Sequence, residues 1–184
     1  MRDKTDQIIK ASISVFVKKG YISATTKEIA LKANVAEVTL YRKFKTKQNL
    51  FENSIKSIIE DKFSSVLEFK EGISIFDFLK ELLNNRLLVV SKNIEVVRML
   101  ISESLVGNLP SELKFTNVIF ENVSKAIKKY FEANEITLDY QATSKIIGGI
   151  ILSYVILPNE KLYHKMNIEE RKNYLNKYLN IIGT

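Results

Sequence analysis

Apolar residues recur with a helical spacing along nearly the whole chain. Between residues 4 and 19, Ile8, Val15 and Phe16 fall on one side of a helix with 3.6 residues per turn. Similar patterns predict helices at residues 75–91, 94–106, 111–133, 138–156 and 168–182. No segment convincingly alternates apolar and polar residues with the period of two that marks a half-buried strand. The sequence therefore predicts an all-α fold of about nine helices.

The first fifty residues carry the signals of two helices that are followed by a tight turn. The first helix is expected to end at Gly20. Thr25 and Glu28 have the spacing of a capping box, in which each side chain accepts a hydrogen bond from the other residue's backbone N–H. The second helix then runs to about Ala33. Asn34 follows, and asparagine tolerates the left-handed conformation that a sharp turn requires.

A short third helix is predicted from Ala36 to Phe44, with Leu40 and Phe44 facing the core. Thr46 is placed to cap a long fourth helix, whose apolar pattern continues toward Phe69. Two short helices joined by a tight turn form a helix-turn-helix. In such a unit the third helix of this chain would enter the major groove of DNA.

The positive charge of the chain is confined to the same segment. Of a net charge of +7, residues 1–50 hold eleven Lys or Arg and four Asp or Glu, whereas residues 51–184 hold seventeen of each. A basic block joined to a neutral body indicates a module that meets a polyanion; the alternative is a solvated basic surface without a partner. We predict a DNA-binding domain over residues 1–48 and a larger helical domain, with another role, over residues 49–184.

Lys47 lies in the first turn of the predicted fourth helix. There the helix dipole disfavours a cation by about 0.3–1 kcal/mol. The position is understandable if a phosphate is drawn to that terminus and shared with the ammonium group; the alternative is an ordinary surface lysine. Thr26 and Lys27 begin the second helix and are candidates for the same role.

The outward faces of the third helix supply candidates for reading bases. Arg42 or Lys43 can donate to guanine O6 and N7, and Val38 can pack against a thymine methyl group. Glu37 can accept from cytosine N4, or it can serve only to favour the helix start. The predicted DNA-contacting residues are Thr26, Lys27, Glu37, Val38, Thr39, Tyr41, Arg42, Lys43 and Lys47.

The span from Ile9 to Leu50 carries a family resemblance. The residues that carry it are Ala11, Phe16, Gly20, Tyr21, Thr25, Thr26, Ile29, Ala30, Ala33, Val35, Thr39, Leu40, Tyr41, Phe44, Lys47 and Leu50. At these spacings the segment resembles the DNA-binding domain of TetR-family transcriptional regulators. The resemblance implies a homodimer, usually a repressor, that binds a palindromic double-stranded DNA operator and releases it when a small molecule enters the C-terminal domain.

The resemblance also implies roles by position. The family positions that typically contact phosphate or sugar are occupied here by Thr26, Thr39, Tyr41 and Lys47. The positions that more often face bases are occupied by Lys27, Glu37, Val38 and Lys43.

Four residues depart from the family pattern. Asn34 replaces the usual glycine, which the turn should tolerate. Ala36 replaces the usual serine and removes the expected cap of the reading helix. Glu37 and Lys43 differ from the commonest residues at their positions, so no operator sequence can be inferred.

The last two predicted helices are candidates for a dimer interface. Residues 144–157 are apolar on almost every face, and Gly148 and Gly149 imply a close helix approach that offsets their low helix propensity. Two helices from each subunit would form a four-helix interface; alternatively, both belong to the monomer core. The predicted interface residues are Ile146, Gly149, Ile150, Ser153, Tyr154, Leu175, Tyr178, Leu179 and Ile182.

A pocket for a small hydrophobic or amphipathic effector is predicted among the helices between these regions. Its candidate residues are Phe63, Leu67, Phe78, Leu82, Arg86, Met99, Glu103, Phe120, Tyr130 and Ile147. Apolar residues at helical spacing belong to a core more often than to a pocket. Glu103 can equally form a structural ion pair with Arg98.

Composition argues against catalysis. The chain has no cysteine, and its one histidine, His164, lies in a predicted loop where a solvated side chain is expected. We predict no metal site, no cofactor and no enzyme activity. The N-terminus lacks a secretory signal, and the longest nearly uncharged run, residues 146–157, is too short to span a membrane, so we expect a cytoplasmic protein. The competing hypothesis is a dimeric regulator that acts through a protein partner without a small-molecule switch.

Overall fold

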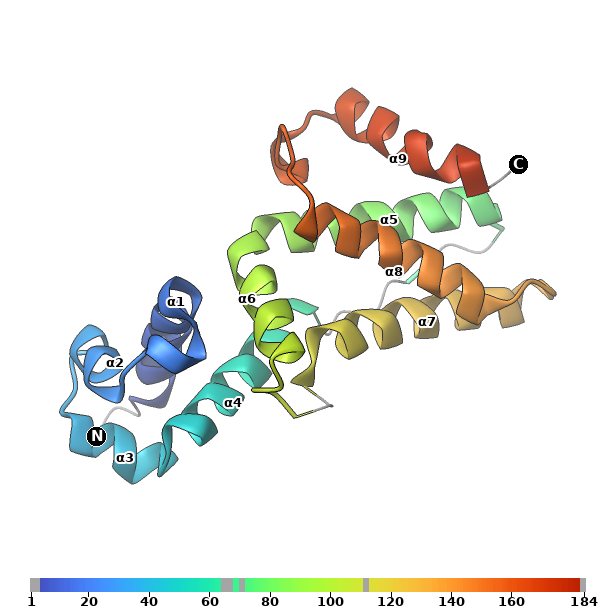
Figure 1. Ribbon diagram of the computed structural model, residues 1–184. Helices are drawn as coiled ribbons and strands as arrows, with labels where there is room; N and C mark the ends of the chain where they lie inside the picture. Colours follow the sequence, from blue (N-terminus) through green and yellow to red (C-terminus); the bar gives the residue numbers. More distant parts are fainter. Residues whose placement is uncertain (1–3, 64–67, 70–71, 111–112, 183–184) are drawn as a thin grey trace. The chain divides into compact units, whose positions relative to one another are not determined.

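The computed structural model describes residues 4–63, 68–69, 72–110 and 113–182. Within these ranges every regular element is helical, which confirms the predicted all-α fold (Figure 1). The α-helices are α1 (Thr5–Ser23), α2 (Thr26–Lys32), α3 (Glu37–Phe44), α4 (Lys47–Ile58), α5 (Ile75–Lys92), α6 (Ile94–Leu105), α7 (Phe115–Ala133), α8 (Tyr140–Ile156) and α9 (Ile168–Ile182). A π-helical turn follows α4 at Ile59–Phe63, and a 3-10 turn lies at Tyr163–Lys165.

The chain forms two compact units. The first unit contains Met1–Ser64 and Arg98–Val118, so most of α6 folds with the N-terminal helices. The second unit contains Ser65–Val97 and Ile119–Thr184. The apolar pattern of α6 does not identify the helices that it packs against, so its place in the first unit could not be predicted.

In the first unit, α1 packs against α4. The rings of Phe16 and Phe51 meet edge to face with their centroids 4.8 Å apart, and both side chains are fully buried. Ser12 and Ser54 are also fully buried, and their hydroxyl groups form a hydrogen bond between the two helices. Small side chains at this crossing let the backbones approach closely, while the aromatic pair fills the space beside them.

The predicted local signals at the start of the chain are confirmed. Thr25 and Glu28 form both hydrogen bonds of the capping box. Asn34 has a φ of 48°, the left-handed conformation expected of the turn after α2. Thr46 caps α4 by accepting from the backbone N–H of Asn49.

The long fourth helix predicted to continue toward Phe69 is different in the structure. The α-helical part ends at Ile58 and passes into the π-helical turn. Residues 64–67 lie outside the described ranges. An apolar pattern with helical spacing does not distinguish an α-helix from a single π-helical turn, which shifts the register by one residue.

In the second unit, α5 packs against both α8 and α9 (Figure 1). Phe78 of α5 stacks on Tyr130 of α7 with the ring centroids 4.0 Å apart, and Phe69 contacts both rings edge to face. The hydroxyl group of Tyr130 donates to the carbonyl oxygen of Ile73 at 2.6 Å. These contacts close an aromatic core between α5 and α7.

His164 corrects the prediction of a solvated side chain. It is partly buried in the 3-10 turn, and its Nδ1 lies 2.8 Å from the hydroxyl oxygen of Ser91. Ser91 also accepts from the hydroxyl group of Tyr154 and from the backbone N–H of His164. The neighbouring Tyr163 is fully buried, and burial raises its pKa to about 12. The loop is therefore fastened to α5 and α8 by a polar network that a linear sequence does not reveal.

The two adjacent glycines of α8 have different surroundings. A Cβ atom on Gly148 would lie 2.5 Å from Cε1 of Phe120, so glycine at this position is needed for the approach of α7. A Cβ atom on Gly149 would have no described atom within 4 Å of it. The close helix approach predicted for the pair is confirmed for Gly148 within the unit and does not occur there for Gly149.

We predict that Gly148→Ala lowers the thermal unfolding midpoint, whereas Gly149→Ala leaves it unchanged or raises it. Overpacking costs about 1–3 kcal/mol, which exceeds the gain of up to about 1 kcal/mol in helix propensity. Adding Phe120→Leu to Gly148→Ala should recover part of the loss. Equal midpoints for the two single variants would contradict this account of the helix contact.

Candidate nucleic-acid interface

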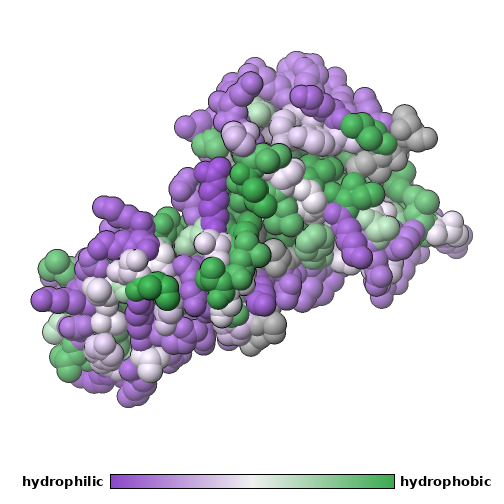
Figure 2. Space-filling view, in the orientation of Figure 1, coloured by the Kyte–Doolittle hydropathy of each residue, from purple (hydrophilic) through white to green (hydrophobic). Residues whose placement is uncertain are grey.

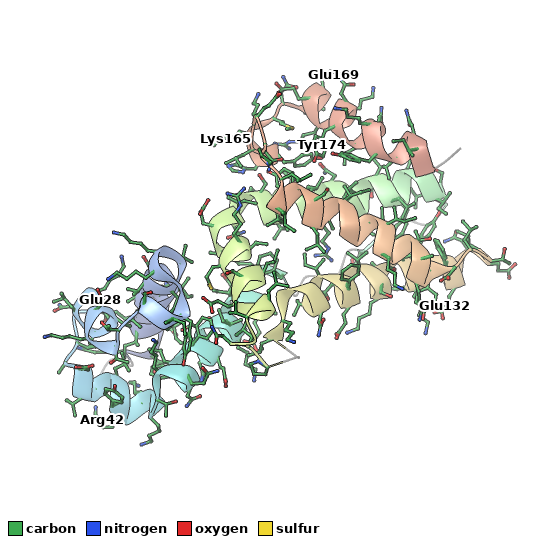
Figure 3. All side chains as sticks on the ribbon, in the orientation of Figure 1. Glu28, Arg42, Glu132, Lys165, Glu169 and Tyr174 are labelled. Carbon is green, nitrogen blue, oxygen red and sulfur yellow. The ribbon has the colours of Figure 1, made fainter. Side chains whose placement is uncertain are left out.

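The helix-turn-helix is formed by α2 and α3. On α3, Leu40 and Phe44 are buried at 0% and 5% exposure, as predicted, and anchor the helix to the first unit. The other faces carry Val38, Tyr41 and Arg42, which are exposed (Figure 3 labels Arg42). Figure 2 shows hydrophilic residues over much of the visible surface of α1 to α4. The predicted reading surface is thus open to solvent.

Thr26, Glu37 and Tyr41 form a hydrogen-bonded group between α2 and α3. Thr26 is buried, and its hydroxyl group donates to Oε1 of Glu37 at 2.6 Å. The hydroxyl group of Tyr41 lies 3.2 Å from the same Thr26 oxygen. Ala36, the N-cap of α3, makes no side-chain cap, as its replacement of serine led us to expect. Glu37 therefore ties the start of α3 to α2.

The remaining predicted contacts of these helices have separate surroundings. Lys43 donates to the hydroxyl group of Thr5 at 2.8 Å, which links α3 to the start of α1. Lys27 is exposed at the start of α2, and Thr39 is half-buried. The structure brings all nine predicted DNA-contacting residues into the first unit, on α2, α3 and the first residue of α4.

Lys47, the first residue of α4, has two partners inside the protein. Its Nζ donates to the carbonyl oxygen of Ile22 at 3.1 Å, and it lies 4.6 Å from the centroid of the Tyr21 ring. Both contacts favour a cation and offset the unfavourable helix dipole. They also hold the ammonium group at the N-terminus of α4, where the helix dipole attracts an anion.

The partners of Lys47 are positioned by a kink at Gly20. This residue has φ 73° and ψ 170°, a conformation essentially restricted to glycine. The backbone N–H of Tyr21, released from the helix, donates to Oε1 of Glu103 at 2.8 Å. The amide of Asn108 donates to the second oxygen of Glu103 at 2.6 Å. Glu103 is a buried residue of α6, and its hydrogen bond from Tyr21 fastens the end of α1 to α6.

Sequence reasoning missed this role of Glu103. The sequence offers Glu103 as a polar contact in an effector pocket, as a partner of Arg98 in a structural ion pair, or as a surface group. The signal that would have helped is the combination of Gly20 and Tyr21, since a glycine kink leaves a backbone N–H that needs an acceptor. The identity of that acceptor, 82 residues away, is not encoded locally.

Glu28 adds a charged contact at the start of α2. Its carboxylate accepts from the Lys19 ammonium and from Thr25, and these hydrogen bonds hold its pKa below the ordinary value (Figure 3). A lowered pKa in the folded state stabilises the fold above the unfolded pKa, and this stability is lost as pH falls through the folded pKa. The Glu28 side chain is partly exposed, so solvent screens the contribution of this contact.

Comparison with known proteins identifies the family. A family model described as "Bacterial regulatory proteins, tetR family" matches residues 8–53, which include the whole helix-turn-helix. QacR of Staphylococcus aureus (strain Mu50 / ATCC 700699), named as an HTH-type transcriptional regulator, is 28% identical over 96% of this chain and 94% of its own length. These matches support a TetR-family transcriptional regulator.

Other relatives of this TetR-family regulator agree. YvkB of Bacillus subtilis (strain 168), named as an uncharacterized HTH-type transcriptional regulator, is 44% identical over 84 residues, and this match spans less than half of either protein, 46% of this chain and 42% of YvkB. IcaR of Staphylococcus aureus (strain Newman), named as a negative regulator of a biofilm operon, is 24% identical over 77% of each chain. These relatives are named as regulators and not as enzymes.

A solved structure supports the fold. A TetR-family transcriptional regulator from Pseudomonas syringae pv. tomato str. DC3000 superposes with a TM-score of 0.72 at 17% identity, covering 98% of this chain and 96% of that one. The architecture is therefore that of a TetR-family regulator with an N-terminal helix-turn-helix. The basic surface of α2 and α3 belongs to a DNA-binding transcriptional regulator.

The predicted dimer residues fall into two groups. Tyr154, Leu175 and Leu179 are only 2–3% exposed and are covered by the second unit itself. This corrects their assignment, because a side chain buried in its own core offers almost no area to a second copy. On α8, Ile146 and Gly149 are exposed, while Ile150, Ser153 and, on α9, Tyr178 are half-buried. The side chain of Ile182 lies outside the described residues.

The residues predicted for the effector pocket are divided between the two units. Phe63, Met99 and Glu103 belong to the first unit, and Leu67 lies outside the described residues. The candidates in the second unit are Phe78, Leu82, Arg86, Phe120, Tyr130 and Ile147.

Most of those six serve packing. Phe78, Leu82 and Ile147 have no exposed area, Phe78 stacks on Tyr130, and Phe120 covers Gly148. Arg86 is also buried, and burial lowers the pKa of its guanidinium group. As the sequence allowed, residues at helical spacing here form core.

The described part of the second unit has surface clefts at two places, and none of their described lining residues is a predicted pocket residue. One, of about 750 Å³, lies between α5 and α9 and is lined in part by Asp77, Lys80 and Arg171. The other, of about 900 Å³, lies between the end of α8 and α9, where Tyr174 faces Tyr154 (Figure 3). Among the described residues, no helix has the length and hydropathy to cross a membrane, and no three potential metal-ligating side chains cluster.

We predict that Glu103→Ala lowers the free energy of unfolding by about 1–3 kcal/mol, because it leaves the Tyr21 N–H without its acceptor. Glu103→Gln should lose less, since its amide oxygen can still accept from Tyr21. Urea unfolding, monitored by circular dichroism, measures the free energy of unfolding of both variants. If Glu103→Ala unfolds like the wild type, the kink at Gly20 does not depend on this carboxylate.

Proposed function

We propose that this TetR-family regulator is a homodimeric repressor that binds a palindromic operator and leaves it when a small effector binds. The observation that carries the proposal is the exposed basic surface of α3, set beside two helix N-termini that can hold phosphates. Thr26 and Lys27 stand at the start of α2, and Lys47 stands at the start of α4. Helix N-termini and lysines are suited to phosphate, and an exposed helix between them is suited to the major groove.

Within this surface we assign separate roles. Thr39, Tyr41 and Lys47 would position the protein on the backbone, as the family pattern implies. Val38, Arg42 and Lys43 would face bases; Val38 is 72% exposed and suits a thymine methyl group. Repression is supported by the relative IcaR, which is named as a negative regulator. The place of action would be the cytoplasm, where the operator lies.

We propose that the dimer forms through the exposed side of α8. Ile146, Ile156 and Leu157 are 47%, 66% and 58% exposed, and Figure 2 shows hydrophobic residues at the surface along this helix. No described residue lies within 4 Å of a Cβ atom placed on Gly149, so this part of α8 is not covered by the described part of its own chain. A two-fold axis there would present two copies of α3 to half-sites about one DNA turn, or a multiple, apart.

We predict that Lys47→Ala weakens operator binding and reduces the slope of log affinity against log salt by about 0.9, the value for one lost phosphate contact. Lys47→Met keeps the aliphatic part of the side chain, and we expect it to lower the operator affinity and the salt slope as Lys47→Ala does. Fluorescence anisotropy with a labelled duplex from the protein's own upstream region, at several salt concentrations, measures the slope.

The matched control is Lys56→Ala, an exposed lysine in the last turn of the same helix. It should leave the slope nearly unchanged. An unaltered affinity and slope for both Lys47 variants, with wild-type unfolding midpoints, would remove Lys47 from the interface.

The effector is proposed from the family resemblance. We expect at least one compound in a panel of hydrophobic cations, acyl compounds and aromatic molecules to raise the unfolding midpoint and to lower operator affinity. A ligand that binds the folded state at 100 times its Kd stabilises by about 2.7 kcal/mol, which thermal shift detects readily. Silence across the panel would favour the alternative of a regulator that responds to a protein partner.

A further inference from the structure

Two hydroxyl groups of the DNA-facing surface are already used inside the protein. Thr26 has one hydroxyl hydrogen, and it is donated to Oε1 of Glu37 at 2.6 Å. The contact between Thr26 and Tyr41, 3.2 Å long, then requires Tyr41 to donate to the Thr26 oxygen. Both hydrogens that could reach a DNA phosphate from this pair therefore point inward.

The carboxylate of Glu37 lies where an anion is favoured. It belongs to the first turn of α3, whose backbone N–H groups and dipole attract negative charge. Ala36 supplies no side-chain cap there. Thr26 adds a buried donor, so the carboxylate has the surroundings that a bound phosphate oxygen would have.

We propose that Glu37 is an internal substitute for a DNA phosphate, and that DNA must displace its carboxylate from Thr26 before the Thr26 and Tyr41 hydroxyl groups can contact the backbone. A carboxylate and a phosphate cannot both accept the single hydrogen of Thr26, and their charges repel at this distance. The proposal rests on the proposed DNA-binding function and refines it. Glu37 is then a positioning residue that weakens binding to every duplex equally.

The two roles considered for Glu37 predict opposite effects on DNA affinity when its charge is removed. If Glu37 accepted from cytosine N4, removing its charge would weaken binding to the operator and relax the preference for one base pair. If Glu37 competes with phosphate, removing its charge strengthens binding to operator and unrelated DNA alike. The neutral variant Glu37→Gln separates the two because it keeps the shape of the side chain.

The test compares wild type, Glu37→Gln and a control, Glu169→Gln, by fluorescence anisotropy with the operator duplex and with an unrelated duplex of equal length. Glu169 is an exposed acid that, like Glu37, lies in the first turn of its helix, here α9 (Figure 3). We expect Glu37→Gln to raise affinity for both duplexes by roughly tenfold, because a neutral amide oxygen accepts from Thr26 more weakly than a carboxylate and no longer repels the phosphate. Glu169→Gln should change neither.

A second background tests the route through Thr26. Thr26→Val lacks the hydroxyl group. In this background, Glu37→Gln should change the logarithm of DNA affinity by less than half as much as it does in the wild type. Unfolding midpoints within a few degrees of wild type confirm that each variant is folded.

The outcomes are distinct. A loss of operator affinity in Glu37→Gln, no change with either duplex, an equal gain in Glu169→Gln, or an undiminished gain in the Thr26→Val background would each overturn the proposal. Failure of the wild type to bind the upstream duplex would instead refute the DNA-binding function itself.

Discussion

The kink at Gly20 is the constraint on which the DNA-facing surface depends. Only glycine adopts this backbone conformation at low cost, and the turn it makes places Tyr21 against the core and the carbonyl oxygen of Ile22 beside Lys47. The rings of Tyr21 and Phe51 lie 4.7 Å apart, so the kink is held from the α4 side as well. The pKa of the Tyr21 hydroxyl group is raised. Burial is the largest cause, and the nearby carboxylates of Glu52 and Glu103 add to it. The position of the first residue of α4 thus follows from a glycine in α1.

Much of this local structure could be predicted because its causes are local. The capping box at Thr25 and Glu28 and the left-handed turn at Asn34 follow from side-chain chemistry within a few residues, and the structure has both. Contacts between distant segments could not be predicted in the same way. Glu103 accepts from Tyr21, and His164 contacts Ser91 across 73 residues, so neither partner is implied by periodicity or composition.

Periodicity was also least informative about the second unit. A helix that is apolar on all sides has the same sequence pattern whether its residues fill a core or face another copy of the chain. Leu175 and Leu179 are covered by their own chain, whereas Ile146 and Gly149 are open, and only the folded neighbours distinguish the pairs. Glu37 presents a similar ambiguity within the first unit, since an acid at a helix start suits a cytosine, a helix dipole and a threonine hydroxyl equally well.

The central claim is that the basic helix-turn-helix binds a two-fold symmetric DNA site as a dimer. A DNase footprint on the DNA upstream of the protein's own gene, at near-physiological salt, tests it most directly when the mass of the excised complex is measured in parallel. The account predicts one protected stretch with two symmetric halves about one helical turn, or a multiple, apart, bound by two copies of the chain. Uniform protection without a preferred stretch, or a complex that contains a single copy, would contradict it.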